Sequence, residues 1–128
     1  MVLDASAIVA ILLGEPGFEE LLEKIERAVI VTAGVPTLIE SVMVLSSRMS
    51  RDGRPMLYGL LRRMDVQIVP FAEEHLDAAV DAFLRFGKGR HRAGLNFGDC
   101  LSYAVASVSG LPLLYTGHDF SETDIPAA

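Results

Sequence analysis

Short apolar runs alternate with longer segments of helical periodicity, and this alternation limits the folds open to the chain more than any other feature. We predict strands where the side chains are apolar or β-branched, at residues 1–3, 29–31, 67–69 and 111–115. We predict helices at residues 5–13, 16–27, 37–49, 57–64, 73–86 and 96–109, and a turn at Asp52-Gly53. Strands that alternate with helices form parallel βαβ units. We therefore expect an α/β fold, a three-layer α/β/α sandwich around a short, mainly parallel sheet.

The size and composition of the chain fit one compact domain spanning residues 1–128. Apolar side chains make up 51% of the sequence, enough to fill a core without a disulfide or a structural metal. The longest apolar stretches are too short to cross a membrane, and no basic segment precedes the first of them. Cys100 is the only cysteine and fits a small core residue, so no intrachain disulfide can form. We expect a cytoplasmic protein with no membrane partner.

Four acidic residues occupy positions near the carboxyl edge of the predicted sheet, where ligands bind in open α/β folds. Asp4 ends the first predicted strand, and Asp119 lies just past the fourth. Glu40 and Asp99 lie in the first turn or so of their predicted helices. If those helices begin at the same edge, all four carboxylates can converge there.

Each acid also has a simpler explanation. Carboxylates near a helix N-terminus, as expected for Glu40 and Asp99, are stabilised by the helix dipole and by free backbone amides. Asp119 can fix a turn through its side chain, and Asp4 can cap the helix that follows it. Asp4 is the hardest to explain in this way, because its neighbours are almost all apolar and an isolated buried carboxylate is costly.

The absence of histidine or cysteine from this set determines the metal that it suits. Carboxylates alone are hard oxygen ligands and favour Mg²⁺, with Mn²⁺ as a substitute, over zinc. Such ions activate water and neutralise charge on a phosphodiester. The hydroxyls of Ser6 and Thr116 could orient these carboxylates or contact phosphate, or else simply cap a helix and form a turn.

The formal net charge of −6 argues against nucleic-acid binding unless the acids are clustered around a metal. A local basic run precedes Asp99 and contains Lys88, Arg90, His91 and Arg92. We predict that Lys88, Arg90 and Arg92 contact an RNA backbone beside the acids. The alternative is an ordinary solvated loop.

Four short segments that contain the acids occur in order along almost the whole chain. They are Val-Leu-Asp-Ala-Ser-Ala at 2–7, Pro-Thr-Leu-Ile-Glu at 36–40, Leu-Asn-Phe-Gly-Asp-Cys at 95–100 and Tyr-Thr-Gly-His-Asp-Phe at 115–120. Together they resemble the PIN-domain toxins of the VapC family. One departure is His118, where relatives often have an acidic or amide residue before the last aspartate.

The resemblance implies a Mg²⁺-dependent endoribonuclease that is the toxin of a type II toxin–antitoxin pair. It assigns Asp4, Glu40 and Asp99 as the main acidic triad for catalysis and metal binding, with Asp119 completing the site. It also implies a homodimer and a small cognate antitoxin that covers the active site.

Two other classes of function remain open from the sequence alone. One is a phosphatase-like α/β domain with Asp4 as nucleophile, although residue 6 is serine where such sites usually have a second acid. The other is a non-catalytic interaction module in which the acids only cap helices.

Overall fold

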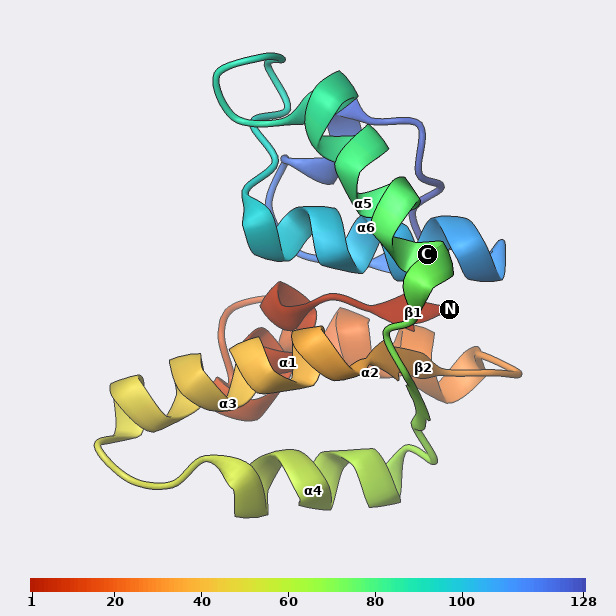
Figure 1. Ribbon diagram of the computed structural model, residues 1–128. Coiled ribbons are helices and arrows are strands. Elements are labelled where there is room, and N and C mark those ends of the chain that lie inside the picture. Colours follow the sequence, from red (N-terminus) through yellow and green to blue (C-terminus); the bar gives the residue numbers. More distant parts are fainter.

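Four parallel strands lie between two layers of helices in the computed structural model, which describes residues 1–128 (Figure 1). The strands are β1 (Val2–Leu3), β2 (Thr32–Gly34), β3 (Gln67–Val69) and β4 (Leu113–Leu114). Their order across the sheet is β3-β2-β1-β4, and all neighbouring strands are parallel. The predicted α/β fold is confirmed.

Each predicted helix is present. The helices are α1 (Ala5–Leu13), α2 (Phe18–Arg27), α3 (Val35–Met49), α4 (Arg54–Arg63), α5 (Glu73–Phe86) and α6 (Phe97–Ser109), and the short 3₁₀ helix η1 (Phe120–Glu122) follows β4. None of them is both long and apolar enough to cross a membrane.

The two faces of the sheet contribute to two separate cores, because successive side chains of a strand point in opposite directions. Leu3 and Leu114 pack with the apolar side chains of α1 to α4. Val2 and Leu113, their neighbours in sequence, pack with α5, α6 and the C-terminal segment. Figure 1 shows the same division, with α5 and α6 on one side of β1 and β2 and the first four helices on the other.

The predicted position of the second strand was wrong. β2 consists of Thr32, Ala33 and Gly34, whereas Val29, in the predicted strand 29–31, is 99% exposed. The small side chains are needed because α6 packs closely on this strand: a Cβ atom added to Gly34 would lie 2.8 Å from Cγ2 of Val105. β-branched residues favour strands, but here close packing against a helix decides which residues form one.

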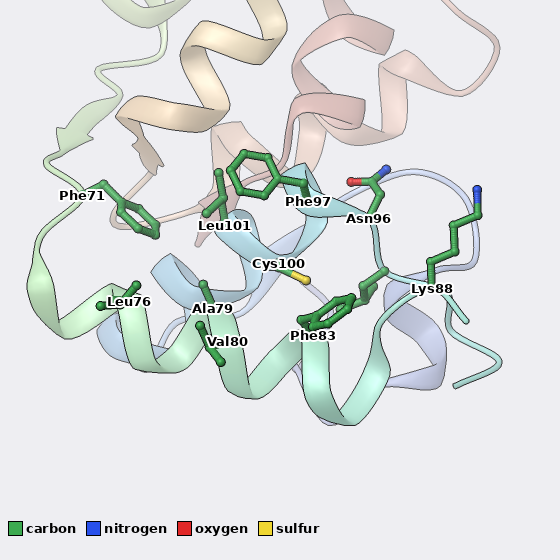
Figure 2. A pocket seen from close by; sticks show the side chains of 11 residues that line it. Phe71, Leu76, Ala79, Val80, Phe83, Lys88, Asn96, Phe97, Cys100 and Leu101 are labelled. Atoms are coloured by element: carbon green, nitrogen blue, oxygen red, sulfur yellow. The ribbon is translucent and has the colours of Figure 1, made fainter. Parts of the chain in front are cut away.

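Four apolar side chains of α5 remain exposed, namely Leu76, Val80, Phe83 and Leu84. The side of α5 that packs on α6 is formed instead by Ala79, Ala82 and Phe86, which are buried. A largely apolar groove of about 540 Å³ runs between α5 and the first turns of α6, and Figure 2 shows the side chains that line it. The exposed ring of Phe97 stands at its edge.

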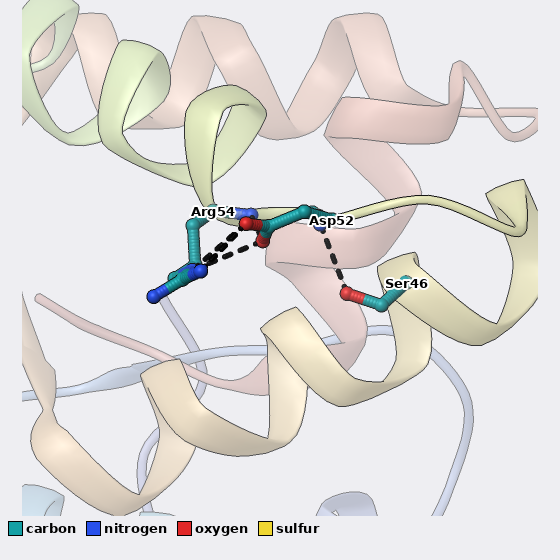
Figure 3. Close-up of polar contacts among 4 residues, drawn as sticks. Ser46, Asp52 and Arg54 are labelled. Atoms are coloured by element: carbon teal, nitrogen blue, oxygen red, sulfur yellow. Dashed lines mark hydrogen bonds and ion pairs between the residues drawn. The ribbon is translucent and has the colours of Figure 1, made fainter.

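The predicted Asp52-Gly53 turn joins α3 to α4 (Figure 3). The backbone amide of Gly53 donates to Oγ of Ser46 at 2.9 Å. The carboxylate of Asp52 accepts from the amide of Arg54 at 3.0 Å and from its guanidinium at 2.8 Å. These contacts fix where α4 begins.

Candidate active site

The chain reverses its direction of progress across the sheet between β1 and β4. It moves from β1 to β2 and β3, then returns to the other side of β1 to form β4. Open α/β sheets bind ligands beyond the carboxyl ends of the strands at such a point. Asp4 directly follows β1 and Asp119 lies in the loop after β4, so both predicted acids are at this edge.

Asp4 is 4% exposed and caps α1. Its Oδ2 atom accepts from the amide of Ser6 at 2.9 Å and from the hydroxyl of Ser6 at 2.5 Å. The same hydroxyl oxygen accepts from the amide of Thr116 at 3.0 Å, which joins the chain after β4 to the start of α1. Ser6 therefore orients Asp4 through its side chain, whereas Thr116 contributes a backbone amide.

Asp99 caps α6 together with Asn96. Oδ2 of Asp99 accepts from the Asn96 amide, and the Asp99 amide donates to Oδ1 of Asn96, both at 2.9 Å. Burial is the largest of the effects that together raise the pKa of Asp99 to about 6. The charges of Asp4, Asp119 and Glu40 add to it, whereas the hydrogen bond from the Asn96 amide lowers the pKa. Asp99 is thus electrostatically coupled to each of the other three acids.

Glu40 is the sixth residue of α3, because that helix begins at Val35. Its position is the second turn, so the explanation that it stabilises the N-terminus of its own helix is wrong. Burial raises the pKa of Glu40, and the charge of Asp4 adds to the effect. The hydroxyls of Thr37 and Ser102 are 3.0 Å apart and hydrogen-bonded, which joins α3 to α6 near the two acids on these helices.

Asp119 is exposed and precedes η1, but its side chain makes no capping hydrogen bond. The turn is instead closed by Ser121, whose amide and hydroxyl both donate to the carbonyl of His118. The predicted turn is present, although the carboxylate of Asp119 is not what fixes it. His118 is exposed beside it.

No arginine or lysine forms an ion pair with any of the four acids. No three Asp, Glu, His or Cys side chains are gathered closely enough to hold a metal ion together in the observed arrangement. The donor chemistry nevertheless fits a hard divalent cation, because the coupled groups are all carboxylates and their charge is uncompensated. The acids are close enough for their charges to raise the pKa of Asp99 and of Glu40 without being gathered at ligand distance.

The predicted RNA-contacting side chains are exposed in the loop between α5 and α6. Arg92 pairs with Glu122 at 2.5 Å, and the guanidinium of Arg90 lies 5.0 Å from the centre of the Phe83 ring. The side chain of Lys88 makes no ion pair and lines the groove next to Asn96 (Figure 2). An exposed ion pair is weak, so a phosphate can compete with Glu122 for Arg92.

Two residues of this region were not expected from the sequence. Glu122 pairs with Arg92, and nothing in the local pattern indicates that contact. Gly98 lies against the Glu40 carboxylate. The sequence did contain a signal for the close packing at Gly98, because a glycine inside a helix is unfavourable unless close packing requires it.

A family model described as PIN domain matches residues 1–126. The chain belongs to the PIN-domain family. It is 45% identical to Ribonuclease VapC of Mycolicibacterium smegmatis, over 99% of this chain and 98% of the relative. It is 42% identical to Ribonuclease VapC30 of Mycobacterium tuberculosis, over 98% of this chain and 95% of the relative. The predicted resemblance to VapC ribonucleases is confirmed, and with it the enzyme class, a nuclease.

Two solved structures have the same fold as this chain. The crystal structure of Mycobacterium tuberculosis VapC20, described as a toxin that cleaves the sarcin–ricin loop, matches with a TM-score of 0.75 at 16% identity. That match covers 99% of this chain and 97% of VapC20. A toxin–antitoxin complex from Klebsiella pneumoniae matches with a TM-score of 0.69 at 16% identity, over 96% of this chain and 92% of the other.

Proposed function

We propose that this VapC-type protein is a Mg²⁺-dependent endoribonuclease, with Mn²⁺ as a possible substitute, and the toxin of a type II toxin–antitoxin pair. It would act in the cytoplasm as a single PIN domain spanning residues 1–128. One observation supports this most strongly: Asp99 is coupled to three further carboxylates from separate parts of the chain, with no cation paired to any of them. Helix capping alone gives no reason for four acids to share one edge.

Asp4, Glu40, Asp99 and Asp119 are the residues that would hold the cation. When bound, such an ion activates water and neutralises charge on the phosphodiester. Ser6 keeps Asp4 in a fixed orientation, and Asn96 does the same for Asp99. In each aspartate the capping bonds use Oδ2, which leaves Oδ1 free of protein hydrogen bonds.

The RNA backbone would run past the basic loop. Lys88 is the first contact, because its ammonium group is free and exposed beside the N-terminus of α6. Arg90 and Arg92 would join when phosphate displaces their present partners, Phe83 and Glu122. Contacts of this kind position a strand without selecting its sequence.

Exposed apolar side chains that line one hollow together with Glu40 support the proposed protein partners, a second copy of this chain and a cognate antitoxin. Ile39 and Met43 of α3 are 56% and 64% exposed, and Phe97 of α6 is 81% exposed. Soluble monomers rarely leave a continuous apolar surface of this kind uncovered. The solved complex from Klebsiella pneumoniae supports an antitoxin as one partner.

The proposal is tested by incubating purified protein with total RNA and Mg²⁺, with and without EDTA. We expect endonucleolytic cleavage that EDTA stops, and Asp4→Asn or Asp99→Asn should abolish it while the circular dichroism spectrum is retained. Exposed Asp81 on α5 provides the control, since Asp81→Asn should cleave like the wild type. Cleavage by Asp4→Asn at the wild-type rate would refute the metal-site assignment.

A further inference from the structure

Gly98 lies in the first turn of α6, one residue before Asp99. Its backbone is not in the left-handed region that favours glycine, so alanine fits the conformation equally well. Glycine within a helix is less favourable than alanine, because it loses more backbone entropy on folding. The reason for a glycine here must therefore be the space that its missing side chain leaves.

That space is filled by Glu40. A Cβ atom added to Gly98 would overlap Oε2 of Glu40 and would lie 2.8 Å from both Cδ and Oε1. The Glu40 carboxylate therefore rests against the α-carbon of Gly98. The atoms that would have to move belong to the end of a flexible side chain, so an added methyl group would displace the carboxylate and leave the backbone in place.

We propose that Gly98 is a positioning residue, whose bare α-carbon seats the Glu40 carboxylate on the first turn of α6, beside Asp99. This inference rests on the proposed metal-dependent function, in which both acids hold the cation. The first amides of a helix have no partners within it and attract negative charge, so the seat favours a carboxylate. The Thr37–Ser102 hydrogen bond fixes α3 against α6. The backbone of α3 therefore cannot shift to bring a displaced Glu40 carboxylate back beside Asp99.

The test compares Gly98→Ala with Gly59→Ala, a matched control on α4 where an added Cβ would meet no atom within 4 Å. Mn²⁺ binding to the metal-free full chain is measured by calorimetry, and thermal unfolding is followed in EDTA. Gly59→Ala should bind Mn²⁺ like the wild type and unfold about 2–4 °C higher, as expected from helix propensity. Gly98→Ala should unfold no lower than the wild type but bind Mn²⁺ at least about tenfold more weakly, a loss of roughly 1.4 kcal/mol.

Introducing Gly98→Ala into a Glu40→Asp protein shows whether the loss of Mn²⁺ binding depends on the position of the Glu40 carboxylate. Aspartate is one methylene shorter than glutamate, so in Glu40→Asp the carboxylate is withdrawn from the position of the added Cβ. Gly98→Ala should then weaken Mn²⁺ binding by less than about threefold.

The inference is overturned if Gly98→Ala binds Mn²⁺ as tightly as Gly59→Ala, if its penalty is unchanged in Glu40→Asp, or if it fails to fold. Wild-type protein that neither binds Mn²⁺ nor cleaves RNA would instead refute the proposed function itself, before any substitution is made.

Discussion

Replacing Asp99 with asparagine should make the metal-free protein more stable at neutral pH while abolishing RNA cleavage. Burial, then the charges of Asp4, Asp119 and Glu40, raise the pKa of Asp99 from 3.8 to about 6. The folded protein therefore binds the proton more tightly than the unfolded chain does. Stability falls as the pH rises from about 4 to 6 and stays reduced above that window. Asparagine has no charge to bury, and its side-chain oxygen can still accept from the Asn96 amide.

The size of this effect follows from the pKa. A rise from 3.8 to about 6 corresponds to at most roughly 3 kcal/mol of destabilisation by the ionised group. Asp99 is only half-buried, so solvent screening reduces the expected value to about 1–2 kcal/mol. For a domain of this size that is an increase of roughly 3–8 °C in the melting temperature.

The assay is thermal unfolding in EDTA at pH 7.5 and near pH 4, with Asp81→Asn as the surface control. Asp99→Asn should melt above the wild type at pH 7.5, and the difference should shrink near pH 4, where the wild-type carboxyl is protonated. Added Mg²⁺ should raise the melting temperature of the wild type and of Asp81→Asn, but not that of Asp99→Asn. If Asp99→Asn melted below the wild type at pH 7.5, the charge of Asp99 would be a stabilising helix cap and the coupled-acid argument would fail.

Three further outcomes are expected from the same geometry. Ser6→Ala should lower the cleavage rate about 10–100-fold, because Asp4 loses the hydroxyl that orients it, and a wild-type rate would show that the bond is dispensable. Arg92→Ala should weaken binding of uncleaved RNA in a fluorescence anisotropy assay, whereas Glu122→Ala, which frees Arg92, should strengthen it; equal effects would exclude competition for Arg92. Mg²⁺ affinity should decrease as the pH falls through about 6, since protonated Asp99 cannot hold a cation, and a flat calorimetric profile would contradict this.

Local sequence signals were sufficient to find every helix, although α3 and α4 begin earlier than predicted. The apolar spacing and end signals of α1 and α5 predicted their bounds as the structure has them. β2 was missed because strand propensity favours Val29 to Val31, whereas the strand actually formed consists of Thr32 to Gly34 and accommodates Val105 of α6. Contact with a helix more than 70 positions further along the chain leaves no mark in the local pattern.

The candidate site also combines features that the local sequence predicts with contacts that depend on distant parts of the chain. Asp4 was placed correctly because a strand end and a helix start meet there in sequence. Glu40 was assigned to the first turn of its helix because Pro36 suggested a later start than Val35. Its contact with Gly98 depends on how α3 and α6 pack, which side-chain periodicity does not encode.

Helix capping and metal binding were competing explanations for these acids, but the hydrogen bonds make them compatible. Asp4 and Asp99 each use Oδ2 to cap a helix, and this bond fixes the direction of the free Oδ1 atom. Glu40 and Asp119 are not held in this way: the Glu40 carboxylate is packed against Gly98, and the exposed Asp119 makes no capping hydrogen bond. The site thus contains two acids fixed by hydrogen bonds at helix N-termini and two that are not. The first pair would define where the cation binds, and Glu40 would depend on its seat at Gly98 to lie beside it.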